Sequence, residues 1–150
     1  MRVVTVKYLE DNRGKIQNRE RAKQLIDYSE MRQGNITPSD VDGFFEKGDK
    51  IFVFYEYKLA GVEMPKGQKL GLMRIVNGLT TAGKSVVLFL CRHEQYDPNK
   101  DIAGDRAIVE RVYMNNRWYK GNGCTAKELT DRYIKWAENL SPLQEDEYTA

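Results

Sequence analysis

Two carboxylates and a lysine in the first half of the chain have the spacing that metal-assisted chemistry needs. Glu56 and Lys58 follow an apolar run, residues 51–55, and Asp42 stands fourteen residues before Glu56. Because successive side chains of a strand alternate between its faces, Glu56 and Lys58 point the same way. Unpaired charges in an interior strand cost on the order of several kcal/mol, which predicts a bound cation or an ordered polar network there.

These groups suit a hard divalent ion. An aspartate on one strand and a glutamate on its hairpin neighbour supply oxygen ligands to Mg²⁺ or Mn²⁺, which keeps water and phosphate oxygens in its other positions. The ion lowers the pKa of a bound water and stabilises charge on a phosphate, while Lys58 positions the nucleophile. The residues therefore predict phosphodiester hydrolysis without histidine. Asp40 competes with Asp42 for the ligand position.

Gln68 is the fourth candidate. It falls on one helical stripe with Leu72, Ile75 and Leu79, near the start of an expected helix. A glutamine at the sheet-facing N-terminal end of a helix can hydrogen-bond a carboxylate, a water or a phosphate, and the helix dipole favours anions there. Gln68 is therefore expected to face the carboxylates.

The framework that must position these groups follows from hydrophobic periodicity and turn residues. The pattern predicts an α/β fold in one domain, residues 1–150, with a mixed central sheet flanked by helices. The expected strands are 2–9, 40–46, 50–58, 85–91, 107–114 and 117–119, and the expected helices are 18–33, 66–79 and 125–140. Residues 47–49 are predicted to form a hairpin turn, and Asn18 is predicted to be a helix N-cap. An acidic tail, 144–150, follows the C-terminal hairpin and helix of residues 105–140.

Composition excludes several classes of protein. One histidine and two cysteines are too few for a zinc finger, a Cys/His cluster or a disulfide scaffold. A net charge of +2 excludes a polycationic coat, so any site for a polyanion must be local. No stretch has the roughly 18 uncharged apolar residues of a membrane span, and a cytoplasmic protein of a prokaryotic or phage-infected cell is the expectation.

As a set, these residues resemble a known family. Asp42, then Glu56-Tyr57-Lys58, then Gly67-Gln68 opening a helix, is similar to the PD-(D/E)XK nuclease superfamily, the restriction-endonuclease-like fold. The quoted runs are Thr37-Pro-Ser-Asp-Val-Asp-Gly43, Tyr55-Glu-Tyr-Lys58 and Pro65-Lys-Gly-Gln68, which resemble small phage and bacterial members close to the replication-repair (VRR-NUC-like) branch. The resemblance covers residues 18–92 and implies an αβββαβ core.

The resemblance implies a Mg²⁺-dependent deoxyribonuclease, an endonuclease of phage or bacterial replication, repair or recombination. Asp42 and Glu56 take the positions of the metal ligands, Lys58 that of the catalytic lysine and Gln68 that of the helical glutamine. Some branches add a glutamate from the first helix, for which Glu30 is the candidate. DNA is the expected partner, a homodimer would allow both strands of a duplex to be cut, and no organic cofactor is implied.

Further basic residues are candidates for contacts with nucleic acid. They flank the Gln68 helix or lie on the later hairpin, and they are Lys66, Lys69, Arg74, Arg117 and Lys120. Ordinary solvated charges explain the same residues. Two other functions remain open: a non-catalytic binding protein with the nuclease fold, such as a phage-encoded inhibitor or interaction module, and an RNA nuclease of the same fold.

The run Gly78-Leu-Thr-Thr-Ala-Gly-Lys-Ser85 matches the phosphate-binding P-loop pattern. A P-loop joins a strand to a following helix, whereas this run follows a helical segment and leads into a strand. We interpret it as a helix end and a turn.

Overall fold

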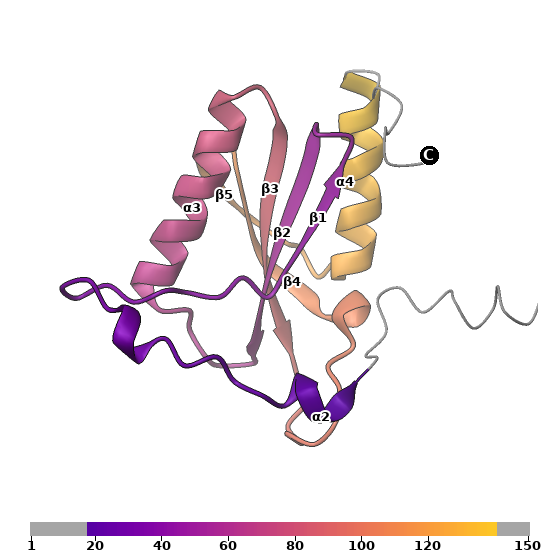
Figure 1. The fold of residues 1–150 in the computed structure, drawn as a ribbon. Coiled ribbons are helices and arrows are strands. Elements are labelled where there is room, and N and C mark those ends of the chain that lie inside the picture. The colour runs from indigo at the N-terminus through magenta and orange to yellow at the C-terminus, as the bar shows by residue number, and fades with distance from the viewer. Residues whose placement is uncertain (1–17, 141–150) are drawn as a thin grey trace, which may run out of the picture. The chain divides into compact units, whose positions relative to one another are not determined.

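The chain divides into two units, Met1–Pro38 and Ser39–Ala150. The computed structural model describes residues 18–140, so the expected strand over 2–9 and the acidic tail 144–150 lie outside the described residues. Ser39–Ala150 contains the sheet and both long helices (Figure 1). No helix in the described part of the chain is both long and apolar enough to cross a bilayer.

The N-terminal unit differs from the helix expected over residues 18–33. Asn18 is the predicted N-cap and accepts a hydrogen bond from the Arg21 amide at 3.2 Å, but α2 spans only Arg19–Ala22. A single turn of 3₁₀ helix, η1 (Ser29–Met31), follows. The prediction of one long helix is therefore wrong. A helix of this length needs tertiary packing of its apolar stripe for stability, and Leu25 on that stripe is 95% exposed.

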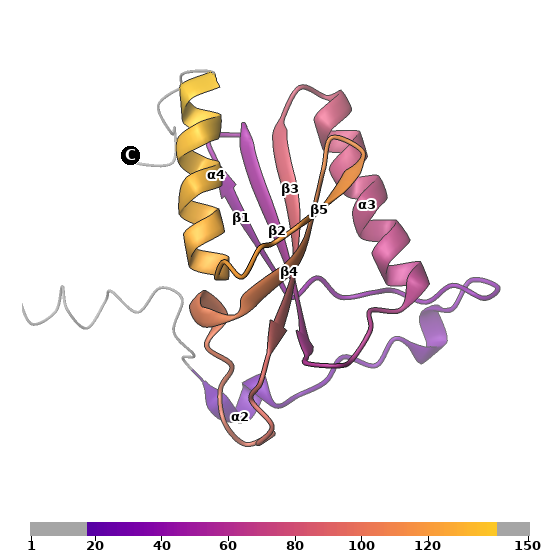
Figure 2. The same ribbon diagram turned by 180° about the vertical axis from the view of Figure 1, so that it is seen from behind.

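Five strands form one mixed sheet in the order β1-β2-β3-β4-β5 (Figures 1 and 2). The strands are β1 (Gly43–Lys47), β2 (Ile51–Leu59), β3 (Ser85–His93), β4 (Ile108–Met114) and β5 (Arg117–Lys120). β2 and β3 are parallel, and the other neighbouring pairs are antiparallel. The predicted α/β class and the mixed sheet are confirmed.

The β1–β2 connection is the predicted hairpin. Gly48 and Asp49 have positive φ angles of 57° and 55°, and the Lys50 amide donates to the Lys47 carbonyl at 3.1 Å. Positive φ at both central residues matches the right-handed twist of the strands that they join. The strand β1 begins at Gly43 rather than Asp40, so the two candidate aspartates precede the strand instead of lying in it.

One long helix covers each face of the sheet (Figures 1 and 2). On one face, Leu72 and Val76 of α3 (Lys66–Thr81) pack on a cluster with Phe54, Leu88 and Tyr113. On the other face, α4 (Ala126–Leu140) packs on a cluster formed by alternate residues of the same strands, which include Val53, Val87, Phe89 and Val109. This alternation defines the two faces of the sheet, which we call the α3 face and the α4 face.

The two long predicted helices, α3 and α4, are confirmed, but their apolar stripes are rotated slightly from the predicted ones. Ile75 is 44% exposed and Trp136 is 48% exposed, whereas the adjacent Val76 and Ala137 are buried. Positions i and i+4 lie on one side of a helix. Gln68 therefore shares the buried side of α3 with Leu72 and Val76.

The register of β4 shifts once. Leu90 pairs with Arg111 while Cys91 pairs with Val109, so Glu110 is the extra residue of a β-bulge. A bulge changes the phase of side-chain alternation along the strand. As a result, Arg111 lies on the same face as Leu90, which packs against the α3-face cluster.

Candidate active site

The two leading carboxylates meet where β1 begins. The β1–β2 register ends at Gly43 opposite Tyr55, and its continuation by one residue sets Asp42 opposite Glu56. The Asp42 side chain takes up this position by accepting a hydrogen bond from the Tyr57 amide at 2.7 Å. The aspartate thus caps the end of the hairpin ladder, and its carboxylate is held next to β2.

Glu56 is the buried member of the pair, with 1% of its surface exposed. Its Oε1 atom accepts a hydrogen bond from Gln68 Nε2 at 2.8 Å and lies 3.5 Å from Lys58 Nζ. Its Oε2 atom is buried and has no hydrogen-bond partner among the residues that the structure describes. An unsatisfied buried acceptor is costly, which marks Oε2 as a position for a ligand or a proton.

The surroundings of Glu56 favour its protonated form. Burial raises the pKa of Glu56 to about 7, and the neighbouring Asp42 carboxylate adds to the increase, while Lys58 opposes it. Desolvation and a like charge both penalise the ionised form. Without a cation, the carboxyl group therefore changes its charge close to neutral pH.

Gln68 joins two parts of the site. It is the third residue of α3, and its Nε2 also donates to the Asp40 carbonyl at 3.2 Å. The amide therefore connects β2 to the segment that precedes β1. Asp40 meets Gln68 through its main chain, whereas Asp42 is the aspartate whose charge acts on Glu56, and the structure thus favours Asp42 as its partner.

Lys58 lies two residues beyond Glu56 on the α3 face of β2, and its side chain is 30% exposed. Its partner in the parallel strand is Arg92, which also lies within 3.5 Å of Glu110. The ammonium can therefore reach both the buried carboxylate and solvent. Such a group can donate to a phosphate or to an attacking water.

The other predicted basic residues are distributed over both faces. Lys66 and Lys69 lie in the first turn of α3, and Arg74 is exposed further along the helix. Lys120 pairs with Arg111 on the α3 face. Arg117 pairs with Met114, which packs against the α4-face cluster, so Arg117 lies on the side of β5 away from Glu56. The extra candidate, Glu30, lies in η1 of the other unit and stays a prediction.

The donor set is that of a two-carboxylate site. In residues 18–140, no group of three or more His, Cys, Asp or Glu side chains lies together in a way that could hold a metal ion. Mg²⁺ is commonly held by one or two carboxylates together with waters and substrate phosphates. The unpaired Oε2 of Glu56 beside Asp42 therefore fits a divalent ion.

Sequence reasoning did not connect Arg111 and Arg92 with Glu56 and Lys58. The signal that finds them is strand register: Arg92 is opposite Lys58, and Arg111 is two strands from Glu56 through Leu90. The interpretation of residues 78–85 as a helix end and a turn is confirmed. α3 continues to Thr81, and the lysine of the pattern, Lys84, pairs with Asp49 at 3.0 Å.

Comparison with known proteins found no matching family model, no matching curated protein and no matching solved structure.

Proposed function

We propose that the chain is a metal-dependent nuclease that hydrolyses phosphodiester bonds in DNA, with the site arrangement of the PD-(D/E)XK nucleases. The observation that carries the proposal is the buried Glu56, which has one oxygen bound by Gln68 and the other without a partner in the described residues. Asp42 and Lys58 adjoin it. An endonuclease of phage or bacterial replication, repair or recombination is the role that we infer.

Asp42 and Glu56 would hold Mg²⁺ or Mn²⁺. When bound, such an ion lowers the pKa of a water and stabilises charge on the phosphate that is attacked. Gln68 fixes the orientation of the Glu56 carboxylate through Oε1 and leaves Oε2 available. The Tyr57 amide fixes the Asp42 carboxylate in the same way. Both ligands are thus oriented before any substrate arrives, as metal sites require.

Lys58 supplies the positive charge closest to the pair. Its Nζ can donate to a non-bridging phosphate oxygen or to the attacking water, because it has three N–H groups and one described carboxylate contact at 3.5 Å. A fixed ammonium stabilises negative charge that develops in the transition state. Loss of this charge should therefore lower the rate of cleavage more than the affinity for DNA.

The order of elements supports part of the proposed core. The hairpin β1–β2, the helix α3 and the parallel strand β3 supply its β-β-α-β portion. The helix that would open the core is not formed over residues 18–33, where only α2 and η1 are found. The αβββαβ assignment therefore remains a proposal that rests on the site.

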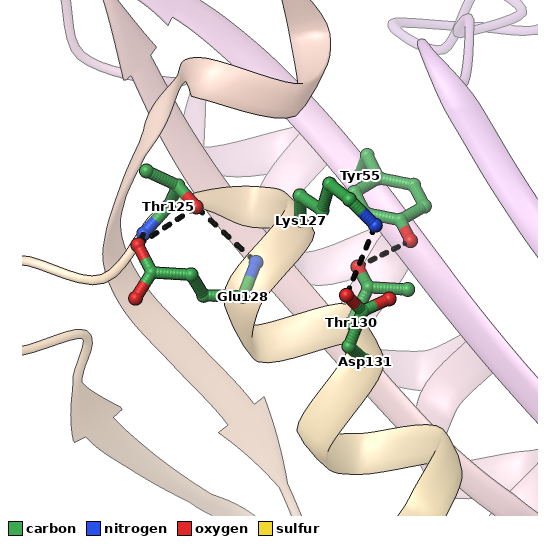
Figure 3. Close-up of polar contacts among 6 residues, drawn as sticks. All are labelled: Tyr55, Thr125, Lys127, Glu128, Thr130 and Asp131. Carbon is green, nitrogen blue, oxygen red and sulfur yellow. Dashed lines mark hydrogen bonds and ion pairs between the residues drawn. The ribbon is translucent and has the colours of Figure 1, made fainter.

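Cleavage assays test the proposed function. Purified protein is incubated with supercoiled, linear and branched DNA in Mg²⁺ or Mn²⁺, with matched RNA substrates in parallel. We expect DNA cleavage that is lost in Glu56→Gln and retained in Asp131→Asn. Asp131 is an appropriate control because it forms an exposed acid–lysine pair with Lys127 at 3.0 Å on α4 (Figure 3). Equal cleavage by wild type and Glu56→Gln would exclude this site as the source of activity.

A second candidate is a non-catalytic binding protein with the same fold. Such a protein needs no metal, and the cations near Trp118 would serve it as well as they would serve a nuclease. Calorimetry with Mn²⁺ separates the two: no heat of binding, together with capture of DNA, would favour the binding protein. Preferential cleavage of RNA would instead indicate an RNA nuclease.

A further inference from the structure

A row of cross-strand partners leads from Glu56 to two cations. Glu56 pairs with Leu90, Leu90 with Arg111, and Arg111 with Lys120. Partners in register share one face of a sheet, so this row runs across the α3 face at right angles to the strands. With strands about 4.8 Å apart, Arg111 stands about 10 Å and Lys120 about 14 Å from Glu56.

Trp118 orders the cations beside this row. Lys69 Nζ lies 4.8 Å from the centroid of the Trp118 ring, and Arg111 Cζ lies 6.0 Å from it. The ring itself packs on the buried Tyr113, with 4.8 Å between centroids. Cations held over an indole keep their charge and lose part of their conformational freedom. Trp118 therefore brings a helix cation and a strand cation together.

No carboxylate neutralises these cations in the described part of the chain. Lys69, Arg111 and Lys120 form no ion pair there. Arg92, in contrast, is paired with Glu110 at 3.5 Å. The N-terminus of α3 adds to the positive potential, because its first turn has no acidic residue and no side chain caps it. Helix N-terminal amides attract anions. The positive charge of this region is thus available to a polyanion.

We propose that this row is the track of the substrate backbone: phosphates on one side of the scissile bond contact Arg111 and Lys120, with Lys69 above them. The inference rests on the proposed function only for the position of the scissile phosphate at Glu56. The carboxylates repel the polyanion at one end of the row and the cations attract it at the other. On the opposite flank the described strands supply only β1, whose register leads to the acidic Asp42, so fewer phosphate contacts are expected there.

The β4–β5 hairpin supplies its own control. Arg117 and Lys120 lie on the same short strand, yet they face opposite sides of the sheet. Arg117→Ala removes the same charge from the same hairpin without touching the row. A general electrostatic effect would weaken DNA binding equally in Arg117→Ala and Lys120→Ala. The proposed track predicts that only Lys120→Ala weakens it.

Binding is measured by fluorescence anisotropy with a labelled DNA duplex, in the Glu56→Gln background so that substrate is not consumed. We expect Arg111→Ala and Lys120→Ala each to weaken binding and to reduce the slope of log K against log salt by about 0.9. Arg117→Ala should leave both unchanged. Thermal unfolding checks that each variant is folded, which exposed residues should permit.

A second measurement needs no variant. Single phosphates of the duplex are replaced by neutral methylphosphonates, and cleavage by wild-type protein is followed at each substituted position. Sensitivity confined to one side of the scissile bond supports the track. Equal sensitivity on both sides, or unchanged binding and salt slope in Arg111→Ala and Lys120→Ala, overturns it even if DNA is cleaved. If the protein cleaves nothing while these variants lose affinity, the proposed function fails and the row stands as a polyanion-binding surface.

Discussion

Gln68 Nε2 donates to Glu56 Oε1 at 2.8 Å, and this bond joins the first turn of α3 to the buried carboxylate of β2. The glutamine leaves the other carboxylate oxygen without a partner in the described residues. A carboxylate with one oxygen fixed and one free is oriented but not satisfied. The site is therefore prepared for a ligand at the expense of the unliganded protein's stability.

Replacing Gln68 by alanine should weaken metal binding. The ionised form of Glu56 loses the amide donor of Gln68, so the pKa of Glu56 should rise further and a proton should compete better with the ion. Loss of such an outer contact typically lowers metal affinity by about 10–100-fold. Calorimetric titration with Mn²⁺ at pH 8 measures this. Asn139→Ala, an exposed amide on α4, should bind as wild type does.

Replacing Glu56 by glutamine should stabilise the metal-free protein above neutral pH. The pKa of Glu56 is raised from an ordinary 4.5 to about 7 in the folded chain. Below pH 4.5 the group is protonated in both the folded and the unfolded states, and no penalty exists. Between pH 4.5 and 7 the unfolded state loses its proton while the folded state keeps it, so stability falls over this range by roughly 3 kcal/mol in total and levels off above pH 7.

Urea unfolding at pH 5 and pH 8 in EDTA checks this second prediction. Wild type should lose more stability than Glu56→Gln between the two pH values, because the amide does not titrate. Mg²⁺ at pH 8 should recover part of the difference in wild type alone. Parallel behaviour of the two proteins would show that Glu56 is not the titrating group.

Replacing Lys58 by methionine should slow cleavage by about 10²–10³-fold while the affinity for DNA changes little. The ammonium adjoins the carboxylate pair, whereas the cations of the proposed track lie two and three strands away. Single-turnover cleavage and anisotropy separate the two effects. Lys127→Met, which removes the lysine of an exposed α4 pair, is the control (Figure 3).

Gly121→Ala should prevent folding or destabilise the protein severely. A Cβ atom at this position would lie 1.7 Å from the carbonyl oxygen of Val109, so the backbone between β5 and α4 would have to move. Gly71→Ala is the matched control: it lies in α3, where a Cβ meets no atom within 4 Å. We expect it to stabilise the helix by about 0.5–1 kcal/mol. Thermal unfolding compares the two.

Thr125→Ala should destabilise the protein by about 1 kcal/mol. Its Oγ1 accepts from the Glu128 amide at 3.2 Å, and the Glu128 carboxylate accepts from the Thr125 amide at 3.2 Å (Figure 3). This capping box satisfies two amides at the start of α4. Thr125→Ser keeps the hydroxyl and should retain most of the stability, and urea unfolding measures the difference.

The sheet and its two long helices could be predicted because their signals are local. Alternating and continuous apolar runs mark β2 and β3, and turn residues mark both hairpins. The prediction of a helix over residues 18–33 failed because hydrophobic periodicity identifies an apolar stripe but does not show whether another element packs on it. Leu25 and Ile26 belong to that stripe and are 95% and 71% exposed.

The site was predictable to the level of residue types. Glu56, Lys58 and Gln68 are brought together as the spacing implied, and Asp42 reaches Glu56 although it precedes β1. Arg111 could not be placed, since the bulge at Glu110 reverses the alternation along β4. A bulge is a property of the pairing between two strands, and one strand's sequence does not reveal it.

The carboxylate pair lies at one hairpin, and this closeness in sequence predicts an order of events in folding. Asp42, Glu56 and Lys58 belong to one hairpin, which closes in about 1–10 μs, whereas β2 and β3 pair residues as far apart as Ile51 and Ser85. In the early hairpin Glu56 is hydrated and ionised at neutral pH. Because burial raises the pKa of Glu56 to about 7, we expect the carboxyl group to bind a fraction of a proton at neutral pH once α3 covers it. Refolding followed with a pH-indicator dye should therefore show proton uptake in a late phase, and that phase reports the docking of α3.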